Sequence, residues 1–148
     1  MKVYYQMNDK FLIEQRFNKS LSTYKDNAIV QNYMAKKLLN MIEKKKYCDV
    51  FEFGCGCGLL TNEFFKNFQC GNYLANDIVQ SCSEYLSKIS QKIVFNCCDI
   101  EKMKLDRNFD LIISNATFQW LQNPKTAVEN FIVHLKPCLL YTSDAADE

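Results

Sequence analysis

Short apolar runs alternate along this chain with segments whose apolar residues recur at helical spacing. Runs rich in β-branched and aromatic residues predict strands at residues 47–53, 73–76, 92–97 and 109–115. Helical spacing predicts helices at residues 26–46, 59–68, 79–89 and 124–135, with a shorter helix and a turn within residues 14–24. Strands that alternate with helices indicate an α/β fold, with a parallel sheet covered by helices on both faces.

Polar or glycine residues follow each expected strand. The continuous apolar run at residues 109–115 suits a strand that is buried on both faces. In a doubly wound sheet, ligands bind beyond the carboxyl ends of the strands. The expected strands end at residues 52–58, Asp77, Asp99 and Asn115. These residues are therefore predicted to share one site.

The composition is that of a single globular domain. The chain has 148 residues, of which 48% are hydrophobic. Its apolar runs are far shorter than the roughly 20 residues that span a bilayer, and its start has no secretory pattern, so we expect a cytoplasmic protein without membrane segments. Lysine and arginine total 18 against 17 acidic residues, and no dense basic patch is interleaved with aromatic residues. Nucleic acid is therefore an unfavoured partner.

Residues 52–58, which read EFGCGCG, could form either a metal clip or a backbone cradle. A zinc site needs paired cysteines, commonly with histidine. The eight cysteines show no repeated Cys-x-x-Cys spacing, and the chain has a single histidine, His134. No metal is therefore expected. The three glycines instead place free amides at a helix N-terminus, where a ligand can approach closely, although a tight turn without a ligand would also need glycine.

Two carboxylates narrow the class of ligand. The loop departs from the dinucleotide pattern because Leu59 stands where the third glycine would be. Glu52 would repel a pyrophosphate but could hold an ammonium group. Asp77 follows Gly58 by 19 residues, where a carboxylate accepts ribose hydroxyls, or it caps the next helix. Asp99 fits a turn, a cap or a contact with an adenine amino group equally well. A ligand with a cationic amino-acid end and a ribose end meets these demands.

The segments VFEFGCGCGLLT, NDI, CDIE and FDLIISNATFQWL resemble, in order and spacing, the motifs of class I S-adenosylmethionine-dependent methyltransferases. The resemblance implies a Rossmann-like fold and S-adenosylmethionine as the cofactor. It also implies that Glu52 meets the methionine ammonium group. Gly54, Gly56 and Gly58 would line the cofactor, with Cys55 in the same loop as a small filler.

The same resemblance assigns roles in cofactor binding to residues at the ends of the other expected strands. Asp77 would bind the ribose hydroxyls, and Ile78 would lie against the adenine. Asp99 and Ile100 would flank the adenine ring. Asn115 would lie near the methionine end of the cofactor.

Two further segments suggest which molecule accepts the methyl group. The sequence SNATFQW at residues 114–120 lacks the Asn-Pro-Pro-aromatic signature of amino-group methylation. Together with RFNKSLSTYKDNAIVQNYMAKKL at residues 16–38, it resembles the BioC type, the malonyl-acyl carrier protein O-methyltransferases of biotin synthesis. That resemblance implies malonyl-acyl carrier protein as the partner, with Tyr24 and Gln119 as candidates for positioning the substrate. Trp120 could equally be a core residue.

Two other functions remain open at this point. One is a methyltransferase that acts on another small molecule or on RNA. The other is a nucleotide-binding module without catalysis.

The last eleven residues, 138–148, differ in character from the rest. They read CLLYTSDAADE and resemble the conceptual translation of a sequencing-library adapter, although a natural acidic terminus is the alternative. We therefore assign residues 1–137 to the N-terminal part of a methyltransferase domain and residues 138–148 to a non-native tail. On this interpretation the sheet has four strands, the fourth is left as a hydrophobic edge, and the polypeptide as written is expected to be poorly stable and inactive.

Overall fold

The computed structural model describes residues 10–43 and 45–144, and it describes their side chains outside residues 21–27 and 138–144. The elements in chain order are α1 (Lys10–Asn27), α2 (Ile29–Asn40), β1 (Lys46–Phe53), α3 (Leu59–Asn67), β2 (Gln69–Asp77), α4 (Cys82–Ser87), β3 (Ile93–Cys97), β4 (Phe109–Asn115), the 3-10 helix η1 (Phe118–Trp120), α5 (Pro124–Ile132) and β5 (Leu135–Asp144).

The strands form one parallel sheet in the order β3-β2-β1-β4-β5. The chain first proceeds from β1 to β2 and β3, and then crosses back to β4 on the other side of β1. The carboxyl ends of β1 and β4 therefore form a topological switch point, where open α/β sheets bind their ligands. The predicted α/β class is confirmed.

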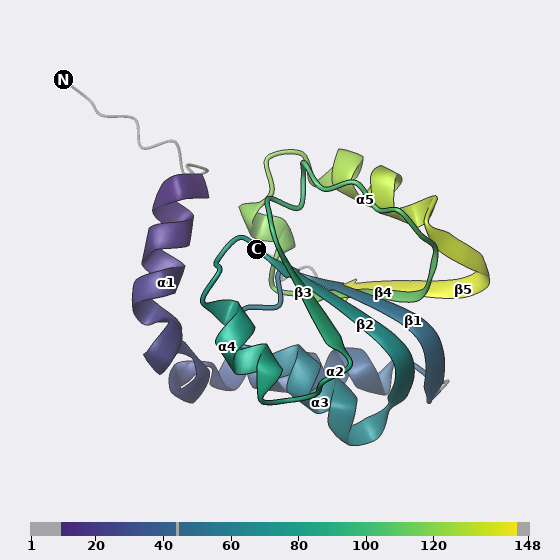
Figure 1. The fold of residues 1–148 in the computed structure, drawn as a ribbon, viewed down its shortest axis with the longest axis horizontal. Helices are drawn as coiled ribbons and strands as arrows, with labels where there is room; N and C mark the ends of the chain where they lie inside the picture. Colours follow the sequence, from purple (N-terminus) through teal and green to yellow (C-terminus); the bar gives the residue numbers. More distant parts are fainter. Residues whose placement is uncertain (1–9, 44, 145–148) are drawn as a thin grey trace.

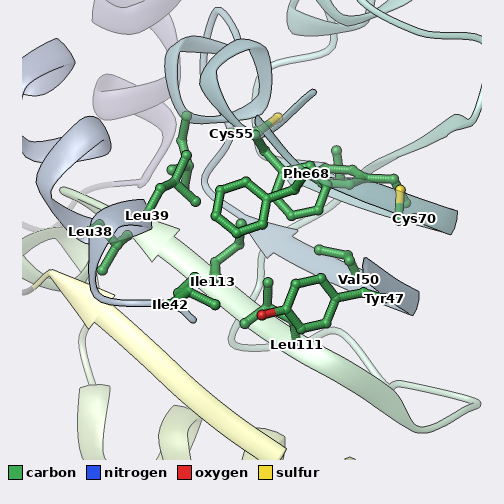
Figure 2. Packing of buried hydrophobic residues seen from close by; sticks show 14 of the residues in the cluster. Leu38, Leu39, Ile42, Tyr47, Val50, Cys55, Phe68, Cys70, Leu111 and Ile113 are labelled. Atoms are coloured by element: carbon green, nitrogen blue, oxygen red, sulfur yellow. The ribbon is translucent and has the colours of Figure 1, made fainter. Parts of the chain in front are cut away.

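Helices cover both faces of the sheet, as Figure 1 shows, with α2, α3 and α4 on one side and α5 on the other. On the first face, Leu38 and Leu39 of α2 and Phe64 of α3 pack with Val50 and Ile113 of the sheet. Figure 2 shows the part of this cluster between α2, β1 and β4.

The opposite face is dominated by phenylalanine. Phe51 and Phe53 of β1 pack with Phe109 of β4 and Phe131 of α5, with ring centroids between 5.1 and 6.0 Å apart. The carboxyl-terminal half of β1 and nearly all of β4 are consequently buried on both sides, as the continuous apolar run at residues 109–115 predicted for β4.

The expectation of four strands was wrong. Residues 135–144 form β5, which pairs in parallel with β4 from Leu111↔Leu140 to Asn115↔Asp144 after a register shift. The run CLLYTS at residues 138–143 has apolar, aromatic and β-branched residues that suit a strand. Because its composition differs from that of the preceding residues, the expectation from sequence placed this run outside the fold. In the structure β4 is not an edge, so that reason for instability fails. The origin of residues 138–148 stays a prediction.

The expected helix at residues 26–46 was also wrong in its boundaries. The backbone breaks at Ala28, between α1 and α2, and α2 ends at Asn40. The side chains of Ile29, Val30 and Tyr33 are 77%, 65% and 66% exposed, because the helix turns a different stripe towards the sheet. That stripe consists of Ala35, Leu38 and Leu39.

Replacing Phe53 by alanine should lower the free energy of unfolding by about 3–5 kcal/mol, because a fully buried aromatic ring leaves a cavity that the sheet cannot close. Urea denaturation measures the effect. The matched control is Val94→Ala on the edge strand β3, where the side chain is 64% exposed, and it should change stability by less than about 0.5 kcal/mol. Equal losses in the two variants would contradict the described core.

Candidate functional site

A cavity of about 840 Å³, counting the open space at its mouth, lies at the carboxyl ends of β1, β2, β3 and β4. The loop after β1 and the ends of β2, β3 and β4 form most of the lining, and α1 and the region of η1 complete it. The strand ends and the loop contribute Gly54, Gly56, Asn76, Asp77, Ile78, Cys98, Asp99, Ile100, Asn115, Ala116 and Thr117. The helix α1 contributes Lys10, Ile13 and Phe17, and η1 contributes Trp120.

The structure brings most of the predicted residues together in this cavity. Seven of the residues predicted from the sequence are in its lining: Gly54, Gly56, Asp77, Ile78, Asp99, Ile100 and Asn115. Glu52, Cys55 and Gly58 are not in the described lining, and all three are buried behind it. That the lining residues bind a cofactor stays a prediction.

The glycine loop is held open by its backbone conformation. Gly54 and Gly56 have φ angles of +65° and +53°, a region that side chains disfavour. A Cβ atom on Gly54 would lie 2.1 Å from Oγ1 of Thr117, so the loop packs tightly against the end of β4 there. A Cβ atom on Gly56 would meet nothing within 4 Å. Gly56 thus presents bare backbone to the cavity.

Asp77 fixes the glycine loop to the end of β2. Its Oδ2 accepts a hydrogen bond from the Gly56 amide at 2.8 Å, and its Oδ1 accepts one from the Val79 amide at 3.0 Å. Burial raises the pKa of Asp77 above its ordinary value, although the amide donors oppose this rise. The N-cap of α4 is Ser81, so the alternative role of Asp77 as a helix cap was wrong.

The sequence interpretation missed Asn76, which is almost completely buried beside Asp77. Its Nδ2 donates to the carbonyl oxygens of Asn96 at 3.2 Å and Cys98 at 3.0 Å. Asn76 thus joins the end of β2 to the loop after β3. A polar residue at the end of an otherwise apolar strand is only a weak sequence signal for such a role. The sequence pattern therefore indicates no role for Asn76 beyond that of the last residue of the expected strand.

Asp99 closes the turn that was one of the roles expected for it, and its contact with an adenine amino group stays a prediction. Its Oδ1 accepts a hydrogen bond from the Glu101 amide at 3.0 Å, which closes a turn, while the residue also lines the cavity. The same oxygen accepts a bond from Nζ of Lys10 at 2.6 Å. Lys10 also pairs with Glu101. Lys10 was missed because it comes from the other end of the sequence.

Glu52 lies beneath the cavity instead of facing it. Its side chain is 1% exposed, and Oε2 accepts hydrogen bonds from Thr61 Oγ1 at 2.6 Å and from the hydroxyl of Tyr73. Burial raises the pKa of Glu52 to about 7, although both hydroxyl donors oppose this rise. Glu52 therefore connects β1 with α3 and β2. Its expected contact with the methionine ammonium group stays a prediction.

Asn115 carries the unsatisfied polar atom of the site. Its Nδ2 donates to the carbonyl oxygen of Gln31, in the first turn of α2, at 3.1 Å. Its Oδ1 is buried and has no hydrogen-bond partner among the described residues. The next residue, Ala116, has a φ angle of +55°, which strains a residue other than glycine. The end of β4 thus offers an acceptor that needs a donor.

The candidates for substrate positioning are less well placed. Gln119 is exposed and absent from the described cavity lining. Tyr24 lies in α1, among the residues whose side chains are outside the described part. Trp120 is not a core residue, because 39% of its side chain is exposed and its ring meets Phe17 edge-on at 5.6 Å. It forms part of the cavity wall.

The described residues contain no group of three histidine, cysteine, aspartate or glutamate side chains that could hold a metal ion. Cys55 and Cys57 are both buried, which agrees with the packing role expected for Cys55. No helix among the described residues has the length and apolar character needed to cross a membrane.

The switch point of the parallel sheet, the glycine loop after β1 and the carboxylate after β2 lie together where open α/β sheets bind their ligands. The methyltransferase domain family matches residues 51–138, which is more than half of the chain. The chain belongs to this family.

Related sequences agree with the family. The malonyl-[acyl-carrier protein] O-methyltransferase of Bacillus cereus is 35% identical over 136 residues, which cover 87% of this chain and 50% of that protein. The malonyl-[acyl-carrier protein] O-methyltransferase 2 of Ilyobacter polytropus is 32% identical over 136 residues, covering 88% of this chain and 52% of that protein. This chain therefore spans about half the length of the curated relatives that it matches.

Solved structures share the fold. The N-methyltransferase NodS of Bradyrhizobium japonicum WM9, solved with S-adenosyl-L-homocysteine, matches with a TM-score of 0.70 and 18% identity, covering 88% of this chain and 71% of that one. A putative methyltransferase in complex with the Trm112 activator of Haloferax volcanii matches with a TM-score of 0.77 and 16% identity, covering 88% and 58%. The Rossmann-like methyltransferase fold is thus confirmed.

Replacing Glu52 by glutamine should flatten the pH dependence of stability. The pKa of Glu52 is raised from 4.5 to about 7 on folding, so the folded protein binds more protons between these values. The contribution of Glu52 to the free energy of unfolding should be fully present below about pH 4.5 and fall by up to about 3 kcal/mol as pH rises from about 5 to about 8. Urea denaturation across this range measures the slope.

In Glu52→Gln, the neutral amide keeps an oxygen for Thr61 and Tyr73 and should remove most of this slope. The control is Glu129→Gln, an exposed residue of α5 whose loss should leave the slope unchanged. An unaltered slope in Glu52→Gln would show that Glu52 is not the buried titrating group.

Proposed function

We propose that this domain binds S-adenosylmethionine in the cavity at the carboxyl ends of the strands. We further propose that the whole protein transfers the methyl group to the free carboxylate of a malonyl thioester on acyl carrier protein, in biotin synthesis. The chain's membership in the methyltransferase domain family and its similarity to relatives named for this reaction support the proposal.

The unpaired Oδ1 of Asn115 is the observation that carries the cofactor assignment. A buried acceptor without a donor costs free energy, and a ligand ammonium group would satisfy it with a charge-assisted hydrogen bond. Asn115 lines the cavity beside Gly54, where the loop offers further backbone groups. We therefore assign the methionine end of the cofactor to Asn115, and we assign Glu52 a supporting role below the loop.

The opposite part of the cavity fits a nucleoside. Asp77 stands at the end of β2 with both carboxylate oxygens already oriented by backbone amides, and these oxygens keep lone pairs for ribose hydroxyls. Ile78 and Ile100 supply apolar surface for a purine ring, and Asp99 lies next to Ile100. The absence of a side chain on Gly56 leaves room for the ligand.

S-adenosylmethionine supplies an electrophilic methyl group on a sulfonium centre. An ionised malonyl carboxylate needs no general base, so the task of this chain is to orient the two reactants and exclude water. Asn115 and the glycine loop would fix one end of the cofactor, while Phe17 and Trp120 cover the cavity with aromatic surface.

A cationic group for the acceptor carboxylate must come from elsewhere. Among the lining residues that the structure describes, Lys10 is the cation, and its ammonium group already pairs with Asp99 and Glu101. We infer that the cationic side chain that binds the acceptor carboxylate lies outside the described residues of this chain. The free cysteines of the described part and a carrier-protein substrate fit a cytoplasmic location.

Asn115→Ala should weaken binding of S-adenosylhomocysteine by about tenfold to a hundredfold, because a hydrogen bond to a charged group is lost. Isothermal titration calorimetry measures this affinity. The stability of the free protein should fall much less than binding, since the variant also removes an unsatisfied buried acceptor.

The matched control is Asn72→Ala, which removes one side-chain hydrogen bond, to Asp49, in the amino-terminal half of β2. It should leave affinity unchanged. Equal affinity in wild type and Asn115→Ala would contradict the assignment of the ammonium end.

Methyl transfer is tested with the whole protein and radiolabelled S-adenosylmethionine. Label should move to malonyl-acyl carrier protein and should not move to acetyl-acyl carrier protein, which lacks the free carboxylate. Transfer to RNA or to another small molecule would replace the proposed acceptor. Cofactor binding without transfer to any acceptor would indicate a non-catalytic module.

A further inference from the structure

The helix α1 covers the cavity without being part of the core. Figure 1 shows α1 in purple across the carboxyl ends of the strands, apart from the layers formed by α2, α3 and α5. Among its described side chains, residues 10–20, none is fully buried. This described part of the helix therefore lies on the surface of the domain instead of in its core.

One end of α1 is attached by an ion pair. Lys10 Nζ donates to Asp99 Oδ1 at 2.6 Å and also pairs with Glu101, and all three side chains are partly shielded from solvent. Glu101 in turn accepts a hydrogen bond from the Asn123 amide at 2.7 Å, just before α5. Lys10 thus joins α1 to the loops after β3 and before α5.

The middle of α1 is attached through the cavity. Ile13 and Phe17 lie on the same face of the helix as Lys10 and line the cavity, and Phe17 meets Trp120 edge-on. Next to them, Ser81 Oγ donates to Asn18 Oδ1 at 2.6 Å.

The chain bends at the other end of α1, between this helix and α2. The backbone leaves the helical conformation at Ala28, with φ of −91° and ψ of 48°, before α2 begins at Ile29. Ala28 itself is buried in a cluster with Cys57 and Val79 beside the glycine loop. This junction anchors the carboxyl end of α1 to the domain.

We propose that α1 is a strap over the ligand and that the pairing of Lys10 with Asp99 and Glu101 is the latch that holds it closed. This inference rests on the proposed function, because the ligand is taken to be the cofactor product S-adenosylhomocysteine. A ligand in the cavity gives Ile13 and Phe17 an apolar surface to cover, which stabilises the closed helix. Closure and binding are then coupled, and each strengthens the other.

The latch predicts faster ligand release when Lys10 loses its charge. Lys10→Met should raise the dissociation rate of S-adenosylhomocysteine about fivefold or more. Stopped-flow fluorescence can follow this rate, since Trp120 is the single tryptophan of the chain and lies in the cavity wall. Lys19→Met, an exposed lysine on the same helix, is the matched control and should leave the rate unchanged. Lys10→Arg keeps the charge and should restore slow release.

A second measurement does not depend on the ligand. Amide hydrogen exchange in residues 11–20 should be faster in ligand-free Lys10→Met than in wild type or Lys19→Met. In wild type, S-adenosylhomocysteine should slow this exchange. Exchange and release rates equal to those of Lys19→Met would overturn the latch.

The outcomes separate this inference from the proposed function. If wild type does not bind S-adenosylhomocysteine, the proposed cofactor fails and the strap loses its ligand, while exchange in ligand-free protein still decides whether Lys10 holds α1. If wild type binds and α1 exchange is unaffected by the ligand, the proposed cofactor stands and the strap is overturned.

Discussion

The hydrogen bond from the Gly56 amide to the Asp77 carboxylate is the contact on which the cavity depends. It joins the loop after β1 to the end of β2, and the second oxygen of Asp77 holds the Val79 amide that follows. One partly buried carboxylate therefore sets the relative positions of the glycine loop, the end of β2 and the segment that leads to α4. Because the loop is kept open by left-handed glycines, the cavity receives backbone groups where a side chain would fill it.

Burial divides the acidic residues at the strand ends into two kinds. Asp77 and Asp99 lie in the cavity wall, whereas Glu52 points into the layer between β1, β2 and α3, where two hydroxyls donate to it. Successive residues of a strand face opposite sides, so Glu52 shares its side of β1 with Val50 and not with Phe51 and Phe53. A carboxylate sealed in this way supports the loop and is costly to ionise.

The remaining wall of the cavity comes from outside the sheet. Lys10 and Phe17 of α1 and Trp120 of η1 close the space that the strand ends leave open. Such a wall is held by a few ion-paired and aromatic contacts, in contrast to the packed core below it.

The sequence by itself determined the α/β class, the glycine loop and the acidic strand ends, because these follow from local apolar periodicity and from residues adjacent in the chain. Only the tertiary structure decided which of these residues share the cavity. Glu52 was expected in the site and lies beneath it, while Lys10 and Asn76 were missed. Residues 138–144 join the sheet despite their unusual composition. Burial, strand pairing and contacts between distant segments arise from packing, which a local pattern does not encode.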